Sequence, residues 1–158
     1  VKASFEMGKV KTGALMVIEQ NVLLTEYERT GIEVDGLISS QLLINIFEHN
    51  TPLHDGAVII RGNRVVSATC YLPLSDNMEI SKELGTRHRA GVGISEVTDA
   101  LTIIVSEETG NVSVTYEGHL YRNLDANGLR EKLGMIQNKE VEENKKRRLW
   151  KGRAKDEK

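Results

Sequence analysis

A carboxylate and an imidazole stand side by side at Asp55 and His54, directly before the apolar run Val58–Ile60. At the mouth of a strand, Asp55 can activate a hydroxyl group or help to hold a divalent cation, which His54 can also ligate. Gly56 has no Cβ, so a ligand or another backbone segment can approach it closely. Because Asp-Gly is also common turn chemistry, the alternative is an ordinary turn beside a surface histidine.

A second polar segment, Gly85-Thr-Arg-His-Arg89, places two arginines around a histidine. Thr86 is expected to cap a helix that runs to about Val97. At the start of a helix, backbone N–H groups and the dipole favour anions, and guanidinium groups grip phosphate oxygens in pairs. The segment therefore predicts a site for a phosphate chain. The alternative is a solvated basic turn, or a structural ion pair with Glu83 or Glu96.

The third candidate is Ser106-Glu107, where an apolar run, Leu101–Val105, enters a turn. Ligands of α/β proteins commonly sit at strand ends. Here Ser106 could donate a hydrogen bond to a phosphate, and the glutamate could bind a ribose or a metal-bound water. The alternative is a polar turn that closes a hairpin near Gly110.

The hydrophobic pattern predicts the scaffold for these segments. Strands are expected at 14–18, 56–61, 64–70, 101–105 and 112–116, and helices at 39–47, 86–97 and from Asp125 to about Leu133. The connection Gly62-Asn63 is typical of a hairpin, so its flanking strands should pair antiparallel. Together these elements predict one α/β domain, a mixed parallel/antiparallel central sheet flanked by helices.

Composition and charge exclude several classes of protein. Cys70 is the only cysteine, which excludes an intrachain disulfide or a thiolate zinc cluster, and its apolar neighbours predict a buried strand thiol. Residues 1–144 carry 13 Lys+Arg and 21 Asp+Glu, whereas residues 145–158 carry 8 and 2. An acidic body is a poor nucleic-acid binder, so no nucleic-acid partner is expected. A polyanionic ligand would need a local basic cluster, and residues 87–89 supply one.

Taken together, the segments resemble the catalytic domain of diadenylate cyclases, the bacterial enzymes that make cyclic di-AMP. The two motifs of that family stand intact as Asp55-Gly-Ala57 and Arg87-His-Arg89. The strings Thr51–Val58, Cys70–Leu74 and Ile80–Arg89 are also similar to this family. The resemblance covers roughly residues 13 to 121, and two ordered motifs make it specific.

The resemblance implies a role for each site residue. Catalytic residues would be Asp55, Gly56, Ala57, Arg87, His88 and Arg89. Tyr71 and Leu72 would border the adenine of ATP, and Gly85, Thr86, Ser106 and Glu107 would bind its phosphates or lie beside them. His54 and Asp55 would hold Mg²⁺ or Mn²⁺.

The implied reaction converts two ATP into cyclic di-AMP and two pyrophosphates. Each 3′-hydroxyl would attack the other ATP's α-phosphate in line across a face-to-face homodimer. The chain most resembles the membrane-tethered branch, whose members carry transmembrane helices before the domain. We therefore expect a soluble piece of a protein held at the cytoplasmic face of the bacterial membrane by an upstream segment. Residues 1–11 would be the tail of an upstream helix or a linker, 12–136 the catalytic domain, and 137–158 a charged, disordered or solvated tail.

Two other functions remain open from the sequence. A non-catalytic nucleotide sensor on the same fold would keep Arg87 and Ser106 but would not need Asp55. A structural module could instead use its basic tail from Lys145 onward to dock on anionic lipid or on a partner, although a merely solvated tail explains the same residues.

Overall fold

The computed structural model describes residues 1–153, without the side chains of 138–141, 143 and 151–153. Its centre is a seven-stranded sheet in the order β2-β4-β3-β1-β5-β6-β7. The strands are β1 (Ala14–Ile18), β2 (Ile32–Leu37), β3 (Ala57–Arg61), β4 (Arg64–Cys70), β5 (Leu101–Val105), β6 (Val112–Tyr116) and β7 (His119–Leu124). β1 and β3 pair parallel, and the other neighbours pair antiparallel. The predicted mixed sheet is confirmed, and so is the hairpin at Gly62.

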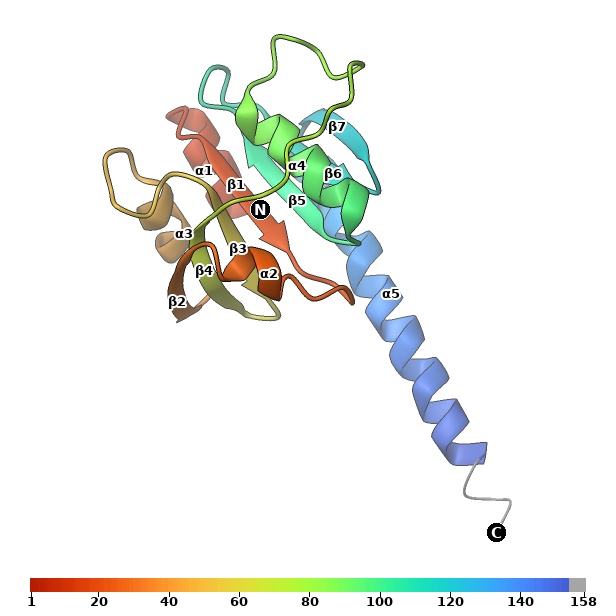
Figure 1. The fold of residues 1–158 in the computed structure, drawn as a ribbon. Helices are drawn as coiled ribbons and strands as arrows, with labels where there is room; N and C mark the ends of the chain where they lie inside the picture. The colour runs from red at the N-terminus through yellow and green to blue at the C-terminus, as the bar shows by residue number, and fades with distance from the viewer. Residues whose placement is uncertain (154–158) are drawn as a thin grey trace.

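Alternating residues of the central strands divide the core into two layers. On one face, Met16 and Ile103 pack with α1 (Lys2–Lys9), α3 (Ser40–Phe47) and the first part of α5 (Ala126–Arg153). On the other face, Leu15 and Ile104 pack with α4 (Thr86–Val97), and α2 (Thr25–Glu28) adds Tyr27. Figure 1 shows α4 lying across β5 and β6. Helices therefore cover both faces, as expected for an α/β domain.

Local sequence explains where three helices begin. The Ser39 hydroxyl accepts a hydrogen bond from the backbone N–H of Leu42 at 3.0 Å, so it caps α3 as predicted. Asp125 caps α5 in the same way, accepting from the N–H of Gly128 at 2.7 Å. The N-cap of α4 is Gly85 rather than Thr86, and no side chain caps its first N–H groups.

The sequence analysis did not predict β2, β7 or the short α2. Both strands lie at the edges of the sheet and expose many of their residues, so their apolar alternation is weak. Each also contains a residue with a left-handed backbone conformation, Asp35 at φ 45° and Asn123 at φ 55°, where the pairing register shifts. Such bulges interrupt the two-residue period that identifies a strand.

The two terminal segments are both largely helical. Residues 1–11, expected to be a helix tail or a linker, contain α1, whose Ala3 and Met7 are buried in the core of the domain. The final helix does not end near Leu133 but continues to Arg153, through the residues expected to be disordered. Glu, Lys and Arg, which dominate residues 139–153, are good helix formers, so the charge run favours a solvated helix. In Figure 1, α5 projects away from the domain.

None of the helices within residues 1–153 combines the length and apolar character needed to cross a membrane.

Candidate active site

All three polar segments lie at the same end of the central strands. β1 and β3 begin at this end of the sheet, while β4 and β5, which run antiparallel to them, finish there. The strand ends border a cavity of about 1320 Å³, which is larger than the roughly 300–1,000 Å³ of common small-molecule sites. The strand order thus brings together segments as far apart in the chain as Asp55 and Ser106.

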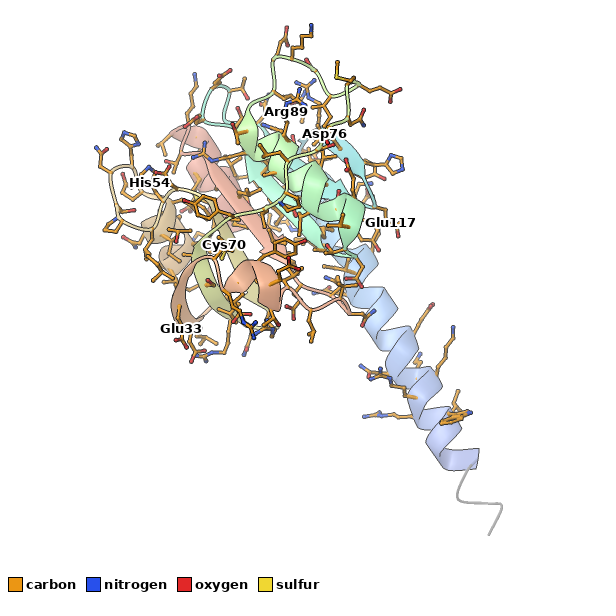
Figure 2. The ribbon with its side chains drawn as sticks, in the orientation of Figure 1. Glu33, His54, Cys70, Asp76, Arg89 and Glu117 are labelled. Atoms are coloured by element: carbon orange, nitrogen blue, oxygen red, sulfur yellow. The ribbon has the colours of Figure 1, made fainter. Side chains whose placement is uncertain are left out.

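Most of the predicted site residues line this cavity. They are His54, Asp55, Gly56, Tyr71, Leu72, Gly85, Thr86, Arg87, His88, Ser106 and Glu107. Two predicted residues do not line it. Ala57 is fully buried as the first residue of β3, paired with Cys70. Arg89 lies in the first turn of α4, where its carbonyl accepts a hydrogen bond from the N–H of Ser75 at 3.0 Å. Figure 2 shows Arg89 where α4 begins and His54 on the loop that leads into β3.

His54 and Asp55 form a close polar pair at the mouth of β3. Their Nε2 and Oδ1 atoms lie 3.2 Å apart, and the aspartate side chain is 86% exposed. His54 Nδ1 lies 2.7 Å from the carbonyl oxygen of Thr51. Because a carbonyl only accepts, Nδ1 carries the proton, and this hydrogen bond orients the ring with Nε2 toward Asp55.

This pair fits one part of a divalent-cation site. Among the described residues, no group of three or more His, Cys, Asp or Glu side chains is placed to hold a metal ion. The pair itself offers one carboxylate oxygen and one imidazole nitrogen. Mg²⁺ is commonly held by one or two carboxylates, with water and substrate phosphates completing its shell. The residues present therefore fit a cation that arrives with a phosphorylated ligand.

The backbone conformation at residue 56 explains why a glycine follows the aspartate. Its φ is 82°, a left-handed conformation that side chains rarely adopt, and a Cβ there would come within 2.9 Å of the backbone of Thr69 and Cys70. The glycine lets the chain turn sharply from the site into β3 while packing directly on the end of β4. A larger residue would move Asp55 relative to the strand.

Arg87 is held in the cavity by two features. Its Nη1 lies 3.1 Å from Oε2 of Glu107, so its partner is Glu107 rather than Glu83 or Glu96. Glu96 instead accepts a short hydrogen bond from the hydroxyl of Ser75. The guanidinium also lies over Gly13, where a Cβ would come within 2.5 Å of Nη1. A guanidinium fixed in this way presents its remaining N–H groups in a defined direction.

His88 is a buried imidazole at the wall of the cavity. It is 7% exposed, and no hydrogen-bond partner is found for its ring among the described side chains. Burial lowers the pKa of His88, and the positive charges of Arg122 and Arg87 lower it further. The imidazole is therefore neutral at neutral pH and offers both a donor and an acceptor.

The end of β4 combines an inert thiol with an exposed ring. Cys70 is buried, as predicted, and burial raises the pKa of its thiol, which disfavours the reactive thiolate. The next residue, Tyr71, is 76% exposed, and its N–H donates to the hydroxyl of Thr30 at 2.8 Å. An exposed aromatic ring at the rim of a cavity can stack on a planar base.

Sequence reasoning missed other residues that line the cavity. They include Gly13, Thr109, Asn111, Ser113, Arg122 and Asn123. Arg122 and Asn123 belong to β7, which the sequence did not predict. No local signal would have identified them, because they reach the site through the pairing of β7 with β6.

The chain is similar in sequence to named bacterial proteins. The cyclic di-AMP synthase CdaA of Bacillus subtilis is 54% identical over 153 residues, which cover 96% of this chain and 56% of that protein. A diadenylate cyclase of Listeria monocytogenes is 58% identical over 123 residues, covering 78% and 45%. This chain thus spans about half the length of the curated relatives it matches.

Solved structures share the fold. The crystal structure of DacA from Staphylococcus aureus, a double mutant, has a TM-score of 0.84 and 53% identity, covering 85% of this chain and 90% of that one. A hypothetical membrane spanning protein from Bacillus cereus has a TM-score of 0.76 and 44% identity, covering 78% and 61%. Residues 1–120 match the family model described as DisA bacterial checkpoint controller nucleotide-binding. The resemblance seen in the two motifs is therefore confirmed, and the chain belongs to this DisA-type nucleotide-binding family.

Proposed function

We propose that this chain is a diadenylate cyclase, which condenses two ATP into cyclic di-AMP and two pyrophosphates. The observation that carries the proposal is that Asp55 and the segment Thr86–His88 line one cavity. A carboxylate that can accept a proton and a cradle for phosphates are the two components that this condensation needs. The names of the relatives in Bacillus subtilis and Listeria monocytogenes support the same activity.

The nucleotide would lie across the ends of the central strands. Its adenine would stack on Tyr71 beside Leu72, at the end of β4. Its phosphates would bind at the start of α4, where the uncapped N–H groups after Gly85 favour an anion. Arg87 would add a charge-assisted contact to the phosphates, and Ser106 would donate to them from the end of β5.

In the proposed reaction, the 3′-hydroxyl of each nucleotide attacks the α-phosphorus of the other, so the following step occurs twice per product. Asp55 takes the proton of that hydroxyl, a new O3′–P bond forms, and the bond to the bridging oxygen of pyrophosphate breaks in line. Arg87 stabilises the negative charge that gathers on the leaving pyrophosphate. A Mg²⁺ or Mn²⁺ ion held by His54 and Asp55 would supply Lewis-acid stabilisation of the phosphate oxygens.

The exposure of Asp55 supports catalysis between two copies. One cavity would hold one ATP, so a symmetric product requires two protomers that face each other with antiparallel nucleotides. The aspartate side chain lines the cavity and is 86% exposed, so a facing protomer would be able to bring the attacking hydroxyl to it. Arg89, outside the cavity, would support the phosphate loop or the opposing nucleotide. Preset geometry of this kind can lower a barrier by ~7–11 kcal/mol.

We also propose that the full-length protein works at the cytoplasmic face of the bacterial membrane. Its support is the name of the Bacillus cereus neighbour, a hypothetical membrane spanning protein at 44% identity. The tether would lie in a segment upstream of the domain, and the catalytic domain would meet ATP in the cytoplasm.

A direct assay tests the activity. The purified chain is incubated with ATP and either Mg²⁺ or Mn²⁺, and the products are identified by mass spectrometry. Cyclic di-AMP and pyrophosphate are expected in a ratio of one to two. If ATP binds but neither metal gives any product over a wide range of protein concentration, the chain is a nucleotide sensor rather than a cyclase.

A further inference from the structure

The pairing of β6 with β7 contains a bulge beside the cavity. Val112 pairs with Leu124 and Val114 pairs with Tyr121. Ser113 on β6 is therefore opposed by two residues of β7, Arg122 and Asn123. Asn123 takes a left-handed conformation, with φ of 55°. Bulges next to active sites commonly redirect a side chain.

This bulge places two successive side chains of β7 at the cavity. Tyr121 and Leu124 both pack against the core layer that includes Leu129 of α5, and the ammonium of Lys132 lies 3.5 Å from the centre of the Tyr121 ring. In a regular strand, residues three apart would face opposite sides of the sheet. The extra residue returns Leu124 to the α5 face, and both Arg122 and Asn123 line the cavity.

Arg122 carries a positive charge that no carboxylate among the described side chains pairs with. Arg61, Arg64 and Arg87 all form ion pairs with carboxylates. For Arg122, neither an ion pair nor a hydrogen bond is found among the described side chains. Its charge acts on the buried ring of His88, which lines the same cavity and has no hydrogen-bond partner within the described part of the chain. A guanidinium that pairs with no described carboxylate, beside a cavity-lining imidazole that can donate a hydrogen bond, is suited to an anion.

The order of the strands indicates which part of a bound nucleotide would be the anion near Arg122. The cavity crosses the sheet from Tyr71 after β4, past Gly56 at β3 and Ser106 after β5, to Arg122 on β7. A nucleotide with its base at β4 and its α-phosphate near β5 directs its terminal phosphates toward β6 and β7. Two strand spacings, roughly 10 Å, separate β5 from β7, a gap that a triphosphate chain and an arginine side chain can bridge together.

We propose that Arg122, aimed into the cavity by the β7 bulge, binds the terminal phosphates of the nucleotide. The inference rests on the proposed function, because the base position at Tyr71 sets the direction of the phosphate chain. On this proposal, Arg122 makes the site bind a triphosphate more tightly than a monophosphate. It also contacts the pyrophosphate that leaves.

Calorimetry with three probes tests this assignment. The probes are AMP, inorganic tripolyphosphate, and ATP with a methylene group between its α- and β-phosphorus atoms, which cannot release pyrophosphate. Arg122→Gln should weaken binding of the ATP analogue and of tripolyphosphate by about 10-fold or more, and leave AMP binding unchanged. Arg122→Lys, which keeps the charge, should recover part of the loss. The control Arg29→Gln removes an exposed arginine that does not line the cavity, and should bind all three probes like the wild type.

A second measurement reports whether the Arg122 charge reaches the site. Because this charge lowers the pKa of His88, Arg122→Gln should raise the midpoint of the His88 titration followed by NMR, and Arg29→Gln should not. Because Arg122 is exposed and unpaired, its replacement should also leave the thermal midpoint unchanged, which separates a binding defect from unfolding.

The outcomes separate the two proposals. If the wild type makes cyclic di-AMP but Arg122→Gln binds the ATP analogue and tripolyphosphate with wild-type affinity, the assignment of Arg122 is wrong and the cyclase proposal stands. If the wild type makes no product but binds tripolyphosphate through Arg122, the cyclase proposal fails and the anion site stands. Equal losses for AMP and for the ATP analogue would place Arg122 away from the terminal phosphates and overturn the inference.

Discussion

The guanidinium of Arg87 is fixed against Glu107, with Nη1 3.1 Å from Oε2. This ion pair joins the first turn of α4 to the turn after β5, two segments that the sequence suggested separately for phosphate binding. The arginine side chain is 23% exposed and the glutamate 65%, so the pair contributes more to the direction of the guanidinium than to stability. The Nη1 group of Arg87 is therefore engaged by Glu107, and the other N–H groups of the guanidinium can bind a ligand.

The first prediction concerns the carboxylate. Asp55→Asn should abolish formation of cyclic di-AMP, because an amide cannot accept the proton of the attacking hydroxyl. The variant should still bind ATP measurably in a calorimeter, since the phosphate cradle is untouched. Asp76→Asn is the matched control, an exposed carboxylate outside the cavity lining, and it should retain activity. Wild-type turnover by Asp55→Asn would remove this residue from the mechanism.

The second prediction uses the close approach of Arg87 to Gly13. In Gly13→Ala, the new Cβ would come within 2.5 Å of Nη1 and 2.6 Å of Cζ, so the mobile end of the arginine must move. We expect a loss of ATP affinity of about 10-fold and little change in the unfolding midpoint, measured by calorimetry and by thermal melting.

Gly134→Ala is the control for this change. Nothing lies within 4 Å of a Cβ at that position in α5, and alanine there should add about 1 kcal/mol of helix stability without changing ATP binding. Normal ATP affinity in Gly13→Ala would show that the position of Arg87 over this glycine is not needed.

The third prediction is a pH dependence of stability that arises from His88. Burial, Arg122 and Arg87 lower its pKa in the folded protein below the ordinary value of 6.5. The unfolded chain therefore binds the proton first as the pH falls, and the folded state loses stability below about pH 6.5. Above that pH the contribution of the neutral imidazole is fully present.

Urea unfolding between pH 8 and pH 5 measures this effect. His88→Gln should flatten the slope of unfolding free energy against pH, by up to ~1.4 kcal/mol per pH unit. His49→Gln, at an exposed position, is the matched control for the loss of a histidine. An unchanged slope in His88→Gln would contradict the lowered pKa.

The fourth prediction concerns assembly. If two facing protomers share one reaction, activity per protomer should rise with protein concentration until dimers saturate. Enzyme assays and sedimentation are compared over the same concentration range. Flat specific activity across the range in which monomers become dimers would refute catalysis between two copies.

The sequence by itself determined the family and the central scaffold. Asp55-Gly-Ala57 and Arg87-His-Arg89 identified the family, because each motif is a short local string that can be read without the tertiary structure. The interior strands, such as Ala14–Ile18, were visible as continuous apolar runs, since burial on both faces favours apolar residues at successive positions. The helix that starts at residue 86 and the hairpin at Gly62 were also predicted from neighbouring residues in the sequence.

The tertiary structure decided which residues share the cavity. Ala57 belongs to the family motif but is buried in the sheet, whereas Arg122 belongs to no motif and lines the site. The approach of Gly13 to Arg87 joins residues that are distant in the chain. The physical reason is that a local sequence pattern reports only which residues are buried and whether they repeat as in a helix or a strand. The strand order and the β7 bulge arise from pairing between distant segments. That pairing decides which residues meet at the ends of the strands.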